Sequence, residues 1–493
     1  MQDARDLNHF LDVRIPLVVI ETFEEKKALD LLLKVAQKHG KDCHRWSLTD
    51  GLVQMSFGPQ LVPQSTSLNE PEAALAHIRA QTTPGIYILC DLHPFLNDQP
   101  NVVRLVKDIA LNHFAVPHTL VFLSYQLKLP PEIARYSISH SLSLPADERI
   151  MEIIREEARL WSERHGNTRV KTDNLTLKKL VSNLQGLSVS DVRRLVRSAI
   201  WNDGQITDSD LPMMNKAKFA LLDMEGVMSF ETQTETFAQV GGLHGLKRWL
   251  MARRSAFHGE DSKLDRPKGI LLLGVQGGGK SLAAKAVAGL WGLPLLRLDI
   301  GALYNKYHGE TERNLREALK LADAMSPCVL WLDEIEKGMS QGSSDNGTSQ
   351  RVLGTFLTWM AERRSRVFIV ATSNDISHLP PELIRKGRLD EIFFVDLPDK
   401  TSRQDIFSIH LGKRHCLPEQ FDLLVLADAA EGFSGSEIEQ AIVAALYRAA
   451  ADDVSLNTDI LLTEITSTSP LSVVMAENIA RLRHWAQERT IPA

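Results

Sequence analysis

Two short motifs constrain the fold of this chain more than any other feature. Residues 274–281 read G-V-Q-G-G-G-K-S, after the apolar run 269–273 and before the amphipathic stretch 282–288. Residues 328–334 read C-V-L-W-L-D-E, an apolar run that ends in two carboxylates. A glycine-rich loop between a buried strand and a helix is the arrangement that cradles phosphate groups. The motifs therefore predict an α/β fold with a parallel sheet and a phosphate-binding loop.

The residue types in these motifs suit the chemistry of a bound triphosphate. Glycines let successive backbone N–H groups face an anion, and the helix N-terminus adds positive potential. The Lys280 ammonium can reach the β- and γ-phosphates, and the Ser281 hydroxyl can ligate Mg²⁺. Asp333 can hold that Mg²⁺ through water, and Glu334 can polarise an attacking water molecule. The predicted cofactors are thus ATP and Mg²⁺, and the predicted loop ligands are Gly274, Val275, Gln276, Gly277, Gly278, Gly279, Lys280, Ser281 and Leu282.

Composition narrows the class of protein. The 493 residues are 44% hydrophobic and 24% charged, as in a soluble globular protein of about two to four domains. The net charge of −6 and the lack of a dense Lys/Arg block argue against a general nucleic-acid-binding protein. The 4 cysteines are far apart, which predicts neither disulfides nor zinc sites and favours a cytoplasmic protein. No apolar run is long enough for a membrane span, so none is expected.

Several spaced motifs between residues 237 and 447 resemble the AAA family of ATPases, in the clade of the FtsH protease, katanin and the proteasomal ATPases. The phosphate loop and the D-E pair are two of these motifs. A third is the leading segment F-A-Q-V-G-G-L at residues 237–243. The resemblance implies that Val240 and Gly241 pack against the adenine ring.

Three further positions match nucleotide-contacting residues of the family. Asn374 ends an apolar strand at the sensor-1 position, where a neutral amide can hold the lytic water. His410 matches a position that touches ribose and adenine, although a histidine alone is more often a satisfied core residue. The segment E-G-F-S-G-S-E-I-E lacks a sensor-2 arginine, as this clade does. The resemblance therefore implies that Gly435 and Ser436 lie close to the nucleotide.

The stretch L-P-P-E-L-I-R-K-G-R-L-D at residues 379–390 carries two candidate arginine fingers, Arg385 and Arg388. In the family pattern they act on the nucleotide of a neighbouring subunit. A guanidinium there neutralises charge that develops on the transferred phosphoryl group. Alone, these arginines would be read as surface salt-bridge residues, but their spacing after Asn374 favours fingers. Fingers of this kind imply a homo-oligomeric ring, and the expected ring is a hexamer.

The stretch Y-N-K-Y-H-G-E-T-E at residues 304–312 resembles the pore loop of the peptide-threading members of the family. Lys306 takes the basic position and Tyr307 the aromatic one. An aromatic side chain on the axis of a ring can grip an extended polypeptide without reading its sequence. The plainer alternative is that Tyr307 covers a local apolar patch. The small polar stretch 339–348 is a candidate second pore loop.

The first half of the chain repeats the order of the second without its chemistry. The sequence L-P-P-E at residues 129–132 mirrors residues 379–382, and three more segments echo the second half in the same order: 86–91, 119–124 and 183–192. After the strand 16–20, however, the chain reads E-T-F-E-E, with no glycine and no phosphate lysine. Carboxylates there would repel a triphosphate. We therefore predict a degenerate first copy.

The predicted fold is two tandem P-loop-type α/β modules, the first degenerate, each with a small helical lid. The predicted boundaries are 1–205 for the degenerate domain, 206–236 for a linker, 237–398 for the catalytic core, 399–455 for its lid and 456–493 for a helical tail. This layout resembles AAA proteins encoded in algal chloroplast genomes and shared with bacteria. The compartment would then be the cytoplasm, or the plastid stroma for a plastid-encoded chain.

Two functions fit the motifs. The first is an Mg-ATP-dependent ring that remodels or unfolds a protein client, still unidentified, through Tyr307. The second is a regulatory switch or activase whose nucleotide state acts on a partner without threading it. A nucleic-acid motor is disfavoured by the net charge.

Overall fold

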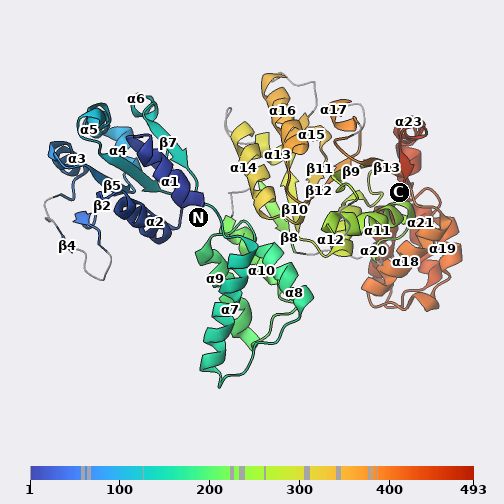
Figure 1. The fold of residues 1–493 in the computed structure, drawn as a ribbon. Helices are drawn as coiled ribbons and strands as arrows, with labels where there is room; N and C mark the ends of the chain where they lie inside the picture. Colours follow the sequence, from blue (N-terminus) through green and yellow to red (C-terminus); the bar gives the residue numbers. More distant parts are fainter. Residues whose placement is uncertain are drawn as a thin grey trace. The chain divides into compact units, whose positions relative to one another are not determined.

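The computed structural model describes residues 2–56, 62–63, 68–125, 127–222, 227–232, 239–259, 263–304, 311–339, 346–375, 379, 381–385 and 387–493. The chain divides into two compact units (Figure 1). The first unit comprises Met1–Glu157 and Gly186–Val196, and the second comprises Ala158–Gln185 and Arg197–Ala493.

The first unit is built on a seven-stranded sheet. Its strands are β1 (Leu17–Glu21), β2 (Asp42–Ser47), β3 (Gly51–Gln54), β4 (Val62–Pro63), β5 (Gly85–Cys90), β6 (Thr119–Ser124) and β7 (Ser137–His140). They lie in the order β4-β3-β2-β5-β6-β1-β7, and all neighbours are parallel except the pairs that include β3.

The second unit has a seven-stranded sheet of the same winding. Its strands are β8 (Met228–Glu231), β9 (Gly269–Gly274), β10 (Leu295–Asp299), β11 (Cys328–Asp333), β12 (Val367–Ser373), β13 (Glu391–Val395) and β14 (Ile491–Pro492). Their order is β14-β13-β9-β12-β11-β10-β8. When the shared parallel strands are numbered along each unit, both sheets read 2-3-4-1-5. The prediction of two α/β modules is confirmed.

Helices cover both faces of each sheet. In the first unit, α1 (Gln2–Asp12) and α2 (Glu25–Lys38) pack on one face, and α3 (Pro71–Ala80) and α5 (Pro100–Leu111) pack on the other. In the second unit, α11 (His244–His258) and α12 (Lys280–Trp291) oppose α14 (Thr311–Ala324) and α16 (Asn346–Glu362). Strands buried on both faces must be apolar throughout, as the parallel strands largely are.

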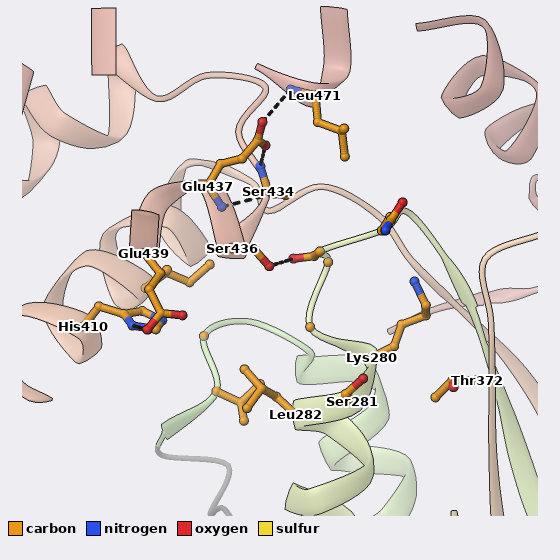
Figure 2. A pocket seen from close by; sticks show the side chains of 18 of the residues that line it. Lys280, Ser281, Leu282, Thr372, His410, Ser434, Ser436, Glu437, Glu439 and Leu471 are labelled. Atoms are coloured by element: carbon orange, nitrogen blue, oxygen red, sulfur yellow. Dashed lines mark hydrogen bonds and ion pairs between the residues drawn. The ribbon is translucent and has the colours of Figure 1, made fainter. Parts of the chain in front are cut away.

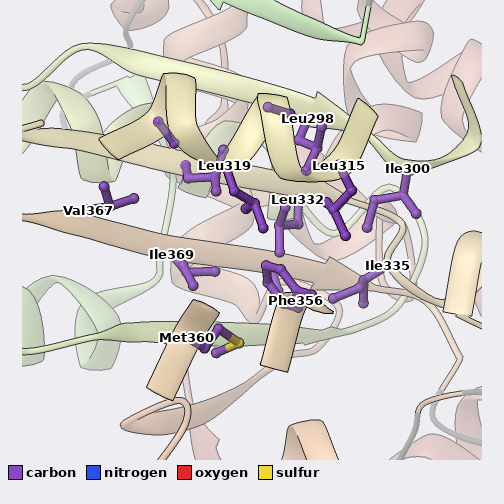
Figure 3. Packing of buried hydrophobic residues seen from close by; sticks show 14 of the residues in the cluster. Leu298, Ile300, Leu315, Leu319, Leu332, Ile335, Phe356, Met360, Val367 and Ile369 are labelled. Atoms are coloured by element: carbon purple, nitrogen blue, oxygen red, sulfur yellow. The ribbon is translucent and has the colours of Figure 1, made fainter. Parts of the chain in front are cut away.

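Successive side chains along the strands of the second unit point to opposite faces of the sheet, and so contribute to the hydrophobic cores on both faces. On β9, Ile270 and Leu272 join the cluster beneath α11 and α12, whereas Leu271 joins the cluster beneath α14 and α16. Figure 3 shows the second cluster, in which Leu315 and Leu319 lie close to strand residues such as Leu332.

A helical lid follows β13 in sequence. It consists of α18 (Lys400–Lys413), α19 (Leu423–Ala429), α20 (Gly435–Ala451) and α21 (Thr458–Ser467), which share a core that includes Phe407, Ile438 and Leu461. A capping box starts α20, because Ser434 and Glu437 each bond the backbone N–H of the other. The corresponding helices after the first sheet are α7 (Asp147–Arg164), α8 (Asn174–Leu184), α9 (Val189–Asp203) and α10 (Leu211–Leu222).

The stretch 206–236, predicted as a linker, contains regular structure. It forms α10 and β8, and β8 pairs antiparallel with β10 at the edge of the second sheet. Val227 and Met228 are buried in the core cluster there. The linker prediction relied on the polar and turn-forming residues of this stretch. The stretch forms a strand because Val227 and Met228 enter the core and β8 pairs with the edge of the sheet.

The predicted helical tail also joins the second unit. Its helices include α22 (Leu471–Val474) and α23 (Ala476–Ala486). Beyond α23, β14 adds a parallel strand to β13, which the sequence analysis did not anticipate. The Arg483 guanidinium holds both carboxylate oxygens of Asp396 at 2.9 Å, which fastens α23 beside β13.

The loop between β1 and α2 in the first unit is closed by a carboxylate of its own chain. Glu24 Oε1 accepts a hydrogen bond of 2.7 Å from the backbone N–H of Val189, where α9 begins. Glu24 Oε2 forms an ion pair of 3.2 Å with Lys27, and 9% of the Glu24 side chain is exposed. Because both sheets share one strand order, this loop is the counterpart of the loop between β9 and α12. An acidic side chain therefore lies where the second unit has its glycines.

Candidate active site

A cavity of about 720 Å³ opens in the second unit where β9, β11 and β12 end. Sheet, phosphate loop, leading segment and lid helices α18 and α20 all contribute to its wall (Figure 2). Many of the predicted nucleotide ligands line it together: Val240, Gly241, Gln276, Gly277, Gly278, Gly279, Lys280, Ser281, Leu282, His410, Gly435 and Ser436. Asp333, Glu334 and Asn374 line it as well.

Close packing explains the glycines of the phosphate loop. Gly277 and Gly279 have positive φ angles of 75° and 94°, which favour glycine. A Cβ atom on Gly277 would lie 3.0 Å from the Ser434 hydroxyl and 3.1 Å from that of Ser436. The leading segment is equally tight, because a Cβ atom on Gly241 would meet Ile406 at 2.7 Å. Glycines at positions 277 and 241 therefore let the phosphate loop and the leading segment pack closely against the lid.

Lys280 is a buried cation whose hydrogen bonds, among the residues described, go to neutral oxygens of its own loop. Its Nζ atom donates to the carbonyl oxygens of Gly274 at 3.0 Å and Val275 at 2.8 Å. Burial lowers the pKa of Lys280 to about 8, although the carboxylates of Glu336, Asp333 and Glu334 act in the opposite direction. A bound phosphate would supply the missing counter-charge.

Both carboxylate oxygens of Asp333 are held by side chains. Oδ1 accepts a hydrogen bond of 2.9 Å from the Thr372 hydroxyl, and Oδ2 accepts one of 2.8 Å from Arg297. The Thr372 oxygen in turn accepts the backbone N–H of Glu334 at 3.1 Å. One threonine therefore orients both acidic residues of the D-E pair.

Glu334 and Asn374 meet as the sequence predicts for a water-activating pair. Asn374 Nδ2 donates to Glu334 Oε1 at 3.1 Å, while Lys337 forms an ion pair with Oε2. Glu334 has a φ of 48°, a left-handed conformation that is uncommon for residues other than glycine and concentrates at functional sites. The Asn374 backbone N–H donates to buried Glu336 at 3.0 Å, which fixes the position of the amide.

The lid touches the phosphate loop through α20. The Ser436 hydroxyl donates to the Gly277 carbonyl oxygen at 3.3 Å (Figure 2). Within the lid, His410 Nδ1 lies 3.4 Å from Glu439 Oε1, and both residues line the cavity. Burial lowers the pKa of His410, against the influence of Glu439, and so favours the neutral ring. Lid movement would therefore be felt directly at the nucleotide.

Some predicted site residues are not brought to the cavity. Arg385 is exposed, and Arg388 donates to the Glu382 carbonyl oxygen at 2.7 Å; neither lines the cavity of its own chain. Lys306 and Tyr307 lie outside the described residues, as does the middle of the candidate second pore loop, 340–345.

Sequence reasoning missed several residues that support the site. Thr372 is a polar residue at the end of an apolar strand, two positions before Asn374, and that placement was a readable signal. Glu336 follows the D-E pair by two positions and is buried. Nothing in its neighbourhood marked Arg297, because its partner Asp333 comes from the adjacent strand.

The first unit retains a remnant of this arrangement. The Ser124 hydroxyl donates to Asp91 Oδ1 at 3.3 Å, as Thr372 does to Asp333 in the second unit. Asp91 directly follows β5 with a φ of 51°, as Glu334 directly follows β11 with a φ of 48°, and Leu92 next to Asp91 is buried. The first unit thus keeps a carboxylate and a hydroxyl at this end of the sheet, whereas Cys90 ends its strand where Asp333 ends β11.

Comparison with known proteins identifies the family of the chain. Residues 270–397 match the model of the ATPase family associated with various cellular activities (AAA), and residues 3–142 and 148–225 match the N-terminal and second domains of SpoVK-like AAA ATPases. The AAA domain-containing protein ycf46 of Guillardia theta is 34% identical over 495 residues, which cover 99% of this chain and 95% of the relative. The chain belongs to the AAA ATPase family. It is an ATP hydrolase with a nucleotide-binding site.

Two further relatives match a smaller share of the chain. The proteasome-activating nucleotidase of Aeropyrum pernix is 37% identical over 193 residues, covering 38% of this chain and 47% of the relative. The cell division cycle protein 48 homolog of Archaeoglobus fulgidus is 32% identical over 220 residues, covering 42% of this chain and 30% of the relative. None of the described helices combines the length and hydropathy that a membrane-spanning segment needs.

The depressed pKa of Lys280 predicts that nucleotide binding weakens in alkaline solution. Protonated Lys280 binds phosphate and neutral Lys280 does not, so affinity falls as the pH rises above a pKa of about 8. The loss is up to about tenfold per pH unit, until the higher pKa of the bound lysine is passed. Calorimetric titration with ATP near pH 7 and near pH 9.5, in buffers of different ionisation enthalpy, measures affinity and proton uptake. Constant affinity without proton uptake would contradict the lowered pKa.

Proposed function

We propose that this AAA ATPase uses Mg²⁺ and ATP in a hexameric ring to remodel or unfold a protein client. One observation carries the assignment of the site: the Asn374 amide bonds the Glu334 carboxylate at 3.1 Å, on the wall of a cavity that also contains buried Lys280. A carboxylate that can accept a proton from water and an amide that can orient the same water are the parts that hydrolysis needs.

The residues of the cavity fit a Mg-nucleotide. The glycine loop leaves room where side chains would collide, and Lys280 is a buried cation without an anionic hydrogen-bond partner among the residues described. Ser281 and Asp333 would hold the metal, which would neutralise charge on the phosphates. Lys280 would bind phosphate oxygen, Glu334 would take the proton of the attacking water, and Asn374 would orient that water.

The arginines at residues 385 and 388 support action between subunits. A finger must reach a phosphate, and neither side chain lines the cavity of its own chain. A neighbouring copy is therefore the natural recipient, and hydrolysis would depend on assembly. This dependence is the basis for proposing a ring.

Arg388→Ala is expected to leave ATP affinity within about twofold of wild type and to lower kcat by about a thousandfold, because a finger acts on developing charge rather than on bound substrate. Steady-state ATPase assays and equilibrium nucleotide binding measure the two effects. Arg316→Ala removes an exposed arginine that pairs with Glu312 on α14 and serves as the matched control. Turnover equal to wild type in Arg388→Ala would refute the finger.

The client-remodelling part rests on the motif that contains Lys306 and Tyr307 and on the named relatives. The decisive experiment is capture of partners from the native cell extract in the presence of ATP, with Glu334→Gln as bait. Lys280→Ala controls for nucleotide dependence, and Glu334→Gln/Tyr307→Ala controls for the pore loop. A partner that is held by the bait and lost without Tyr307 identifies a threaded client.

The second candidate function is a nucleotide-state switch that acts without threading. The Glu24–Val189 bond favours a constant, nucleotide-independent surface on the first unit, to which a partner could dock. A partner retained by the double variant would support this function instead. For either function we propose a protein partner rather than nucleic acid, and a cytoplasmic or plastid-stromal compartment.

A further inference from the structure

Arg297 belongs to the candidate metal site although it does not line the cavity. It lies on β10, in register with Trp331 on β11, and its side chain extends towards the next residue on the same face of that strand, Asp333. The guanidinium carbon lies 4.8 Å above the Trp331 ring, and Nη2 is 2.8 Å from Asp333 Oδ2. Stacking on an aromatic ring and a charge-assisted hydrogen bond together define one orientation of the guanidinium.

The contact completes the hydrogen bonding of Asp333. The Thr372 hydroxyl takes Oδ1 and Arg297 takes Oδ2, so the carboxylate is oriented by two donors. Only 19% of the Asp333 side chain is exposed, whereas 39% of the Arg297 side chain is exposed. The guanidinium thus neutralises a partly buried carboxylate from its solvent side.

A cation beside a metal-binding carboxylate opposes the metal. The attraction of Asp333 for a divalent ion is offset by repulsion from the guanidinium, and both charges act over a few ångströms. At the same time Arg297 keeps the carboxylate in a single orientation, which Thr372 alone would hold less firmly. The effect of charge can be separated from the effect of geometry by substituting lysine. Lysine keeps the positive charge of Arg297 but lacks the planar guanidinium that stacks on Trp331.

We propose that Arg297 is a positioning residue that holds Asp333 and sets the Mg²⁺ concentration at which nucleotide binding becomes tight. This inference rests on the proposed Mg-ATP site. Arg297 on the neighbouring strand β10 lowers the affinity of Asp333 for the metal. Mg²⁺ would therefore bind together with the nucleotide rather than before it.

The test measures binding rather than turnover. In the non-hydrolysing Glu334→Gln background, a fluorescent ATP analogue is titrated at increasing Mg²⁺, and the Mg²⁺ concentration that gives half-maximal binding is compared among variants. Arg297→Gln is expected to lower that concentration by about tenfold, because one repelling charge is gone. Arg297→Lys is expected to restore it to within about twofold of the background value, because the charge returns. Arg316→Gln is the charge-matched control, because it removes an exposed arginine that pairs with Glu312 elsewhere on the second unit.

The outcomes separate the inference from the function beneath it. A half-maximal Mg²⁺ concentration that is unchanged or raised in Arg297→Gln overturns the role of Arg297. The same fall in Arg297→Lys as in Arg297→Gln would refute the charge effect, because lysine keeps the positive charge. If the background protein binds the analogue equally with and without Mg²⁺, the proposed metal assignment fails, and the inference falls with it. Thermal melting of each variant confirms that the fold is intact.

Discussion

Lys280→Ala is expected to weaken ATP binding by about a hundredfold to a thousandfold and to abolish measurable turnover. The ammonium is buried, and its present partners are the carbonyl oxygens of Gly274 and Val275 at 3.0 and 2.8 Å. A phosphate in the cavity would exchange these neutral acceptors for an anion, and removing one partner of a buried ion pair costs about 2–5 kcal/mol. Equilibrium binding and ATPase assays measure the two losses.

Lys280→Met is the matched control for packing. It keeps the aliphatic bulk of the side chain and removes the charge, so it should lose binding as Lys280→Ala does while its melting temperature stays closer to wild type. Full ATPase activity in either variant would overturn the assignment of the phosphate loop.

Glu334→Gln is expected to bind ATP with nearly unchanged affinity and to lower kcat by about 10²- to 10⁴-fold, because an amide cannot take a proton from water. The geometry favours a clean substitution. The Gln side chain keeps an oxygen for the Asn374 amide, which now bonds Glu334 Oε1 at 3.1 Å. Single-turnover hydrolysis with saturating ATP separates the chemical step from binding.

Glu464→Gln is the matched carboxylate control, since Glu464 pairs with Arg448 and neither residue lines the cavity. We expect it to hydrolyse ATP as wild type does. A Glu334→Gln protein with wild-type kcat would show that another group activates the water.

The candidate cavity was predictable because its residues stand in short, spaced motifs. The phosphate loop, the D-E pair and Asn374 each end or follow a strand, and the sheet brings those strand ends together. Gly435 and Ser436 begin α20. Local sequence therefore carried both the identity and the place of these side chains.

Contacts between distant segments were not predictable in the same way. Strand β14 is two residues long and pairs with β13 across the sequence, and β8 is an edge strand in a polar stretch. Arg297 bonds Asp333, 36 positions later, because the register of β10 and β11 brings the two side chains together. Such pairings depend on the assembled sheet, since β-structure is decided by neighbours more than by intrinsic preference.

The Glu24–Val189 bond has a consequence for how the two halves respond to the energy state of the cell. A nucleotide leaves its site when its concentration falls below Kd, whereas a side chain tethered a few bonds away keeps a high effective concentration at all times. The start of α9 in the first unit is therefore held by an anion that cannot be diluted, exchanged or hydrolysed. The second unit holds the start of α20 through a hydroxyl contact to the phosphate loop, at 3.3 Å. The contact in the first unit is therefore independent of nucleotide, whereas the contact in the second unit lies at the phosphate loop itself.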